Sequence, residues 1–177
     1  MEQYCTDGRT LTYNAIGRDG QPTYGGYSQK IVVDEAFAVL IPAALPMQNA
    51  APLLCAGITM YSPLRHWRAG PGKRVAIIGF GGLGHVGVQI ARAMGAHVVV
   101  LDLAADKRGD ALRLGADTFH VSTDPGIFAE LTGAFDIVIS TVPGNIDLDA
   151  YFGLLARDGV LVTLAIPEKP LSLSGSR

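Results

Sequence analysis

From Lys73 onward, short apolar runs alternate regularly with segments whose apolar residues recur at helical spacing. A short, continuous apolar run is typical of a strand that is buried on both faces of a parallel sheet. The runs that predict strands are 74–80, 97–102, 117–122, 135–141 and 160–166. The segments that predict helices are 81–95, 104–115, 124–133 and 145–159. Because right-handed parallel crossovers join strands that alternate with helices, this part predicts an α/β fold with a doubly wound parallel sheet.

The pattern before Met47 is different, because residues 1–46 lack helical periodicity and are rich in Gly, Tyr, Thr and Asp. Alternation predicts one strand at 27–33, and the apolar run 37–42 predicts a second short strand. Two strands are too few for an independent sheet domain. Helical signals begin near Met47, with prolines that can open or kink a helix. We therefore divide the chain into residues 1–46 and residues 47–177.

Composition and charge narrow the classes of function. With 14 basic and 16 acidic residues the net charge is −2, and no basic stripe favours nucleic acid. Two cysteines make no disulfide framework, so we expect a cytoplasmic protein. The polar start is unlike a signal peptide. We expect no membrane span, because Pro42, Pro46 and Pro52 interrupt the most apolar region, 36–61.

A glycine-rich segment, GFGGLG at 79–84, follows the first predicted strand of the sheet and opens a predicted helix. In this context the spacing G-x-G-x-x-G indicates a dinucleotide-binding turn. Gly79 permits the tight turn, Gly81 lets the backbone approach a pyrophosphate, and Gly84 lets the helix pack close to the strand. The helix N-terminus then offers free N–H groups to phosphates. The alternative is a glycine-rich turn that binds nothing.

Asp102 ends the second predicted strand, 18 residues after Gly84. A carboxylate at this position can accept hydrogen bonds from the hydroxyls of the adenosine ribose. The alternative is an aspartate that caps the following helix, because Asp is common at such turns.

Cys55 stands in the middle of an apolar, helix-like segment, PLLCAGITMYSPLRHW at 52–67. From the residues alone it can be a small buried apolar side chain, a nucleophile or a metal ligand. Free cysteine is among the most buried residue types, which favours the first interpretation.

Three segments, 52–67, 69–100 and PEKPL at 167–171, resemble the zinc-dependent medium-chain alcohol dehydrogenases, in particular their cinnamyl-alcohol-dehydrogenase-like subgroup. The resemblance covers nearly the whole chain and is most specific over 52–87. It implies that residues 1–46 are a remnant of a GroES-like catalytic domain. It also implies that residues 47–177 are a Rossmann domain that is incomplete at its C-terminal edge, so the chain resembles the middle of a longer enzyme.

The resemblance also assigns the two cysteines to zinc sites. Cys55 matches a ligand of the catalytic zinc, and Cys5 matches the last cysteine of the structural-zinc loop. A structural site needs four protein ligands and a catalytic site needs three, so both sites are incomplete in this chain. We therefore expect no complete catalytic residue set and no turnover by the chain alone.

The cofactor implied by the resemblance is NAD or NADP, with hydride exchanged between it and a primary alcohol or aldehyde. We expect NAD to be preferred, because a carboxylate at Asp102 repels a 2′-phosphate. Lys107 favours NADP instead, because its ammonium could reach that phosphate. The candidate cofactor-binding residues are Thr59, Gly79, Gly81, Gly82, Leu83, Gly84, Asp102, Lys107, Thr141, Val142, Ala165 and Ile166. For those at strand ends, ordinary packing is the alternative role.

Three functions therefore remain open from the sequence. The first is an alcohol dehydrogenase represented here by its cofactor-binding part, which we expect to form homo-oligomers. The second is a non-catalytic nucleotide-binding or regulatory module. The third is a zinc-independent reductase of the same superfamily, which the positions of the two cysteines argue against.

Overall fold

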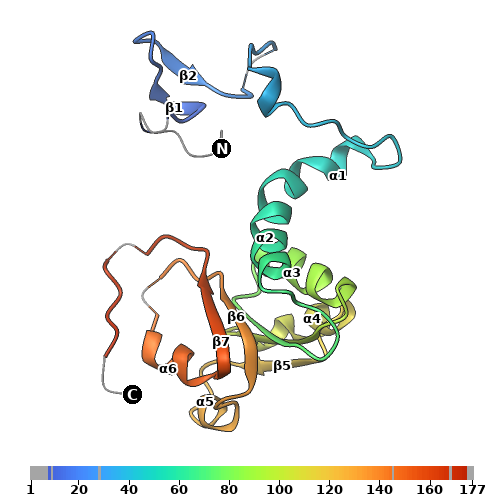
Figure 1. The fold of residues 1–177 in the computed structure, drawn as a ribbon, viewed down its shortest axis with the longest axis vertical. Helices are drawn as coiled ribbons and strands as arrows, with labels where there is room; N and C mark the ends of the chain where they lie inside the picture. Colours follow the sequence, from blue (N-terminus) through green and yellow to red (C-terminus); the bar gives the residue numbers. More distant parts are fainter. Residues whose placement is uncertain (1–7, 9, 28, 145, 168, 175–177) are drawn as a thin grey trace. The chain divides into compact units, whose positions relative to one another are not determined.

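The structure, a computed structural model, describes residues 8, 10–27, 29–144, 146–167 and 169–174 (Figure 1). The chain divides into two units, the first ending at Ala44 and the second beginning at Leu45. Cys5 lies outside the described residues. The assignment of the first unit to a GroES-like domain stays a prediction.

The first unit contains a β-hairpin and a short 3₁₀ helix. The bounds are β1 Tyr13–Ile16, β2 Pro22–Tyr24 and η1 Glu35–Phe37. The two strands pair antiparallel, and Gly20 adopts a φ of +77° in the turn between them. Asp34 caps η1 by accepting a hydrogen bond from the Ala36 backbone N–H at 2.9 Å. None of the described residues of this unit is buried, so its described part has no hydrophobic core of its own.

The two strands predicted at 27–33 and 37–42 are wrong. Among the described residues of these segments, the structure has bends, irregular chain and the end of η1, but no paired strand. Alternation creates a strand only where a second backbone supplies the ladder of hydrogen bonds. The observed hairpin has a sequence signal of its own, because an Asp19-Gly20 pair favours a tight turn.

The second unit is built on a five-stranded parallel sheet with the strand order β5-β4-β3-β6-β7. The bounds are β3 Arg74–Ile78, β4 His97–Asp102, β5 Thr118–Val121, β6 Phe135–Ser140 and β7 Leu155–Thr163. Neighbouring strands pair in parallel throughout. The order reverses beside β3, as in a Rossmann sheet, so the predicted doubly wound fold is confirmed.

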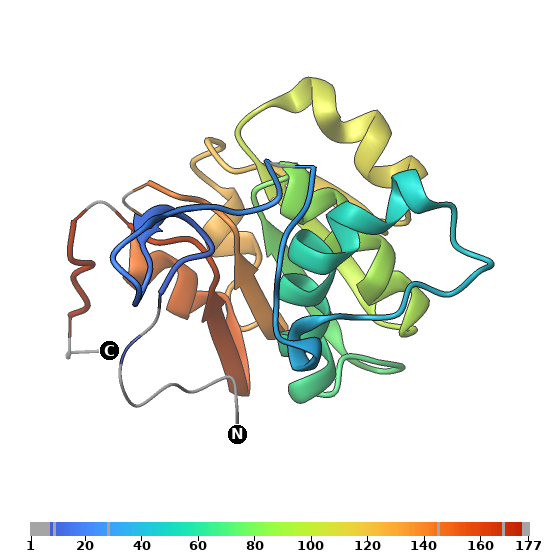
Figure 2. The ribbon, with the colours of Figure 1, turned by 90° about the horizontal axis from the view of Figure 1, so that it is seen from above.

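Helices cover both faces of this sheet (Figure 2). The bounds are α1 Met47–Pro52, the π-helical turn η2 Leu53–Gly57, α2 Ile58–His66, α3 Gly82–Ala93, η3 Ala105–Lys107, α4 Arg108–Arg113, α5 Ile127–Glu130 and α6 Leu148–Gly153. Residues of α2, α3 and α4 share one apolar cluster with one face of the strands. Residues of α5 and α6 share a second cluster with the opposite face. Within β3, Val75 and Ile77 face the first cluster, and Ala76 and Ile78 face the second.

The last crossover is shorter than the sequence pattern predicts. The helix expected over 145–159 ends at Gly153, and β7 begins at Leu155 rather than at residue 160. The pairing of β7 with β6 shifts register between Leu155 and Val160. Asp158 has a positive φ of 61° inside this irregular segment. The polar residues of a bulge resemble a helix end in sequence, which explains the error.

Two aspartates fasten the amino ends of neighbouring strands. Asp136 accepts hydrogen bonds from the Arg74 backbone at 2.9 Å and from Lys73 Nζ at 2.8 Å. The backbone bond lowers the pKa of Asp136 most, and the Lys73 bond lowers it further. Together they outweigh burial, which raises the pKa, and hold it below its usual value. Asp117 accepts a hydrogen bond from the Val98 backbone at 2.7 Å. The amino edge of the sheet is thereby tied together by side chains.

Candidate cofactor-binding site

The glycine-rich turn lies between β3 and α3, and its glycines are crowded at two positions and open at two others. Gly79 has a φ of +93°, and a Cβ there would lie 2.6 Å from Thr141 Oγ1. A Cβ on Gly84 would overlap the carbonyl oxygen of Gly79. On Gly81 or Gly82, a Cβ would meet no described atom within 4 Å. The turn is therefore tight on its protein side and open on its outer side.

The N-terminus of α3 is open to an anion. Gly81 is the N-cap residue, and among the described residues no side chain caps this end. The first N–H groups of a helix have no acceptor within the helix, and its dipole places positive potential there. No acidic residue stands in the first turn. His85, in the first turns of α3, has its Nδ1 2.8 Å from the Gly81 carbonyl oxygen.

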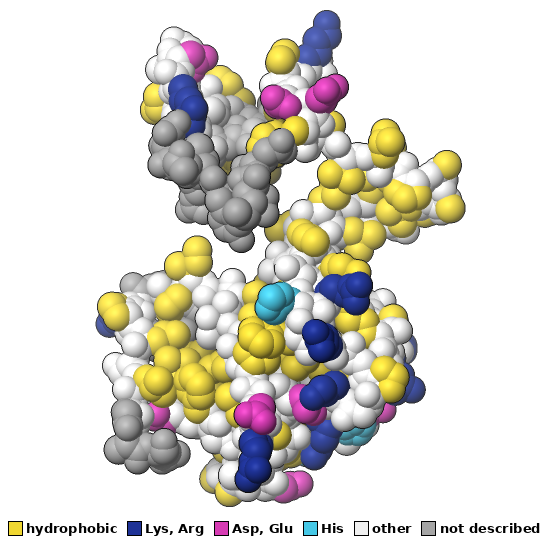
Figure 3. Space-filling model, in the orientation of Figure 1, with side chains coloured by type: hydrophobic (Ala, Val, Ile, Leu, Met, Phe, Trp, Pro, Cys, Tyr) yellow, Lys and Arg dark blue, Asp and Glu magenta, His cyan; other side chains and the backbone are white. Residues whose placement is uncertain are grey.

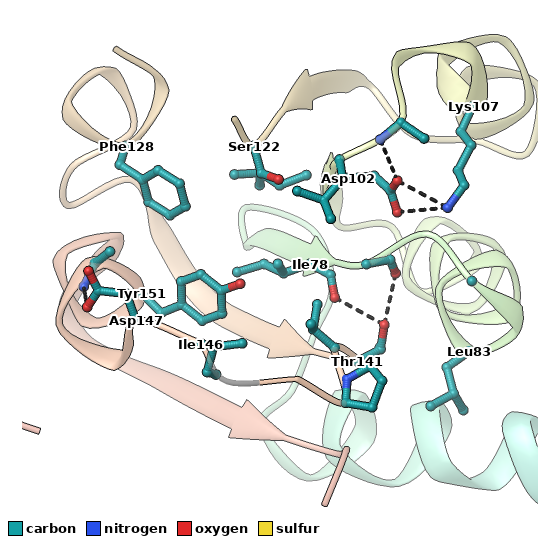
Figure 4. A pocket seen from close by; sticks show the side chains of 18 of the residues that line it. Ile78, Leu83, Asp102, Lys107, Ser122, Phe128, Thr141, Ile146, Asp147 and Tyr151 are labelled. Atoms are coloured by element: carbon teal, nitrogen blue, oxygen red, sulfur yellow. Dashed lines mark hydrogen bonds and ion pairs between the residues drawn. The ribbon is translucent and has the colours of Figure 1, made fainter. Parts of the chain in front are cut away.

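A cleft of about 760 Å³ lies at the carboxyl ends of β3, β4 and β6, beside this turn (Figure 4). It is bordered by eight of the twelve residues that the sequence singled out. They are Gly79, Gly81, Gly82, Leu83, Asp102, Lys107, Thr141 and Val142. Open α/β sheets bind ligands at this edge, where the strand order reverses.

Asp102 ties three parts of the chain together at the rim of this cleft. Its side chain is 8% exposed. Oδ2 accepts a hydrogen bond from the Phe80 backbone at 2.6 Å, and Oδ1 accepts one from the Ala104 backbone at 2.9 Å. Lys107 Nζ lies 3.1 Å from Oδ1 and 3.2 Å from Oδ2. The bond to Ala104 resembles the capping role, although the N-cap of η3 is Ala104 itself.

The charge on Asp102 is maintained by these partners. Burial raises the pKa of Asp102, but the hydrogen bonds from Ala104, Phe80 and Lys107 outweigh it, so the pKa lies below its usual value. The carboxyl is therefore ionised at neutral pH, and Lys107 balances its charge.

Thr141 joins the end of β6 to the glycine-rich turn. Its Oγ1 lies 3.1 Å from the Ile78 carbonyl oxygen and 2.9 Å from that of Gly79, and donates toward them. The hydroxyl thus holds the turn in place, which is the packing role that we considered beside the cofactor role.

An aromatic wall of the cleft was not foreseen. The rings of Phe128 and Tyr151 stack nearly parallel, with centroids 6.0 Å apart, and both line the cleft (Figure 4). Burial, and then the charge of Asp147, raise the pKa of Tyr151, so its hydroxyl stays protonated. Each ring belongs to a different short helix, and only the crossovers bring them together. No local sequence pattern reports such a contact.

Four predicted residues lie apart from the cleft lining. Gly84 is buried beneath the turn. Thr59 lies in α2 and borders a separate hollow of about 470 Å³, together with Leu164. Ala165 and Ile166 follow β7, and neither borders either cavity. The structure brings the end of β7 and Thr59 to one hollow, but it does not join them to the cleft of Asp102.

Cys55 lies in the π-helical turn η2 and is exposed, so its interpretation as a buried apolar side chain is wrong. Within the part of the chain that the structure describes, no three His, Cys, Asp or Glu residues come together as a metal site. These residues alone therefore do not fit a zinc ion, and we derive no chemical step from one.

None of the described helices has the length and apolarity needed to cross a membrane.

Comparison with known proteins decides the family. The profile of the zinc-binding dehydrogenases matches residues 82–177, more than half of the chain. The chain belongs to this family. The resemblance to zinc-type medium-chain alcohol dehydrogenases and their cinnamyl-alcohol-dehydrogenase-like subgroup is thereby confirmed.

Individual relatives agree in both sequence and structure. NADP-dependent alcohol dehydrogenase C 1 of Mycolicibacterium smegmatis is 59% identical over 98% of this chain and 50% of its own length. A cinnamyl alcohol dehydrogenase from Sorghum bicolor superposes with a TM-score of 0.91 at 40% identity, over 98% of this chain and 50% of its own. The CAD from Helicobacter pylori complexed with NADP(H) superposes with a TM-score of 0.84 at 39% identity, over 94% and 47%. The chain thus spans about half the length of these relatives.

Proposed function

We propose that this chain is the cofactor-binding part of a zinc-type alcohol dehydrogenase, which transfers hydride between a primary alcohol or aldehyde and a nicotinamide. The observation that carries the proposal is the cleft, because it combines an open glycine turn, a free helix N-terminus and an ionised carboxylate at a strand end. The relatives' names as alcohol dehydrogenases support the substrate class.

Each residue then has a definite task in holding the cofactor. The open side of Gly81 and Gly82 admits the pyrophosphate, which the N–H groups of α3 bind. Asp102 accepts hydrogen bonds from the ribose of the adenosine. The stacked rings of Phe128 and Tyr151 offer an apolar surface beside it. We assign the hydride transfer to the longer protein, in which Cys55 contributes to the catalytic zinc site.

We further propose that NAD is preferred over NADP. The support is the ionised Asp102 at the rim of the cleft, because a 2′-phosphate would stand against its charge. For two unit charges about 4 Å apart in an effective dielectric near 20, the repulsion is about 4 kcal/mol before solvent and motion reduce it. The names of the relatives assign NADP to those proteins.

Calorimetric titration of the purified chain with NAD tests the main proposal, with Gly81→Val as the decisive variant. Gly81 has a φ of −93°, which valine adopts, and open space lies beyond its Cβ position. We expect Gly81→Val to melt at the same temperature as the parent chain and to lose NAD binding by more than about tenfold, because its side chain fills the phosphate position. Equal binding by both proteins would contradict the proposal.

The same titration with NADP tests the preference. We expect the parent chain to bind NAD about tenfold more tightly, and Asp102→Ser to lose that advantage, because serine removes the charge while keeping a small acceptor. Tighter binding of NADP by the parent chain would contradict the role given to Asp102.

A further inference from the structure

The ion pair between Lys107 and Asp102 occupies the acceptor positions that a ribose needs. An ionised carboxylate offers about four lone-pair directions on its two oxygens. The Phe80 and Ala104 backbones each use one, on different oxygens. Lys107 Nζ spans the remaining side of the carboxylate, 3.1 Å from Oδ1 and 3.2 Å from Oδ2 (Figure 4). One further acceptor direction on each oxygen is therefore covered by a single ammonium group.

The ribose of NAD carries two neighbouring hydroxyls, and each needs one acceptor. Two adjacent donors match the two directions that Lys107 covers. Both backbone bonds come from fixed parts of the chain, whereas Lys107 is partly exposed and ends a flexible side chain. Of the three donors, Lys107 is thus the one that can leave.

We infer that Lys107 competes with the ribose of the cofactor for the Asp102 carboxylate, and this inference rests on the proposed function. NAD displaces the ammonium from Asp102 before its hydroxyls bind there, so the ion pair weakens NAD binding. When NADP binds, the ammonium that leaves the carboxylate can approach the 2′-phosphate instead. Lys107 thereby reduces the preference for NAD over NADP that Asp102 creates, although the charge of the Lys107 ammonium also attracts the cofactor.

The neighbouring cations do not share this position. The Arg108 guanidinium lies over the Phe119 ring, 5.3 Å from its centroid. Arg113 Nη2 pairs with Asp110 Oδ1 at 2.9 Å, and Arg113 does not border the cleft. Arg113→Met therefore removes the same charge from α4, the helix that directly follows η3, without touching Asp102, and it is the matched control for Lys107→Met.

Calorimetric titration with NAD and NADP measures the effect in Lys107→Met and Lys107→Gln. Solvent reaches the Lys107 end of the ion pair and weakens it, so we expect both variants to bind NAD about three- to fivefold more tightly and NADP more weakly. We expect Arg113→Met to leave NAD binding within about twofold of the parent chain. In an Asp102→Asn background, adding Lys107→Met should give no tightening of NAD, because no carboxylate is left to compete for.

Unchanged or weaker NAD binding in both Lys107 variants, with normal binding by the parent chain, would overturn the inference and leave the proposed function intact. Tightening that persists in the Asp102→Asn background would also overturn it, because the effect would not pass through the carboxylate. If the parent chain binds neither cofactor, the proposed function itself fails.

Discussion

At the scale of single residues, the sequence predicted the residues of the candidate site but not their hydrogen-bond partners. Gly79, Gly81 and Asp102 follow from a motif whose spacing reflects the turn and the strand end. The donors to Asp102 could not be foreseen fully, because Phe80 lies 22 residues earlier in the chain and meets it only across the sheet. From the sequence we expect only that Lys107 can reach a 2′-phosphate; its ion pair with the carboxylate is what the structure adds.

The lowered pKa values of Asp102 and Asp136 predict a loss of stability in acid. A carboxyl whose pKa is lower in the folded state stabilises the fold fully above its unfolded value, here 3.8, and loses that contribution as the pH falls below it. Urea unfolding at pH 6 and at steps down to pH 3 measures this. We expect Asp102→Asn and Asp136→Asn each to be less stable at pH 6 and to show a shallower decline. Parallel pH profiles for variants and parent would contradict the assignment.

At the scale of elements, the sequence predicted the buried strands well and the surface strands badly. A strand whose two faces are both covered by helices is apolar on both faces, so its run of residues is easy to recognise. The segment 27–33 only alternates, and alternation does not supply a pairing partner. The length of α6 was wrong for a related reason, because a bulge in β7 depends on the register with β6.

Replacing glycine by alanine should have opposite effects at two positions, one where α3 approaches β3 closely and one on α4, where space is open. Gly84→Ala places a methyl against the Gly79 carbonyl, so we expect a loss of roughly 1–3 kcal/mol in the free energy of unfolding. Gly109→Ala in α4 meets no described atom within 4 Å and improves helix propensity, so we expect a gain of about 0.5 kcal/mol. Denaturant melts compare the two. Equal effects would show that α3 can move away from the turn.

At the scale of the whole molecule, the two units differ in how their apolar residues are placed. The second unit buries two apolar clusters, one on each face of its sheet. It also leaves apolar side chains exposed along α1, η2 and α2, with Met47 72% and Ile58 54% exposed (Figure 3). The alternation of strands and helices was enough to predict the sheet, but periodicity does not report which helix faces stay uncovered.

This exposed surface predicts that the chain self-associates. Contiguous apolar surface and an edge strand both favour contact between copies, and within the described residues β7 pairs on one side only. We expect light scattering to show a mass that rises with protein concentration. Replacing Leu54 and Ile58 by Gln should reduce that rise without lowering the melting temperature, because both side chains are exposed. A concentration-independent monomer would refute this.

The bond between the Phe80 N–H and Asp102 has a consequence for engineering this site. The carboxylate to which we assign the choice of cofactor is also a structural acceptor for the glycine-rich turn, at 2.6 Å. Replacing Asp102 by Ala or Gly to recruit NADP therefore leaves a buried backbone N–H without its acceptor, which costs about 1–3 kcal/mol. Retargeting the proposed site thus requires a small side chain that still accepts a hydrogen bond, and a redesign that only deletes the charge would loosen the glycine-rich turn to which we assign the binding of either cofactor.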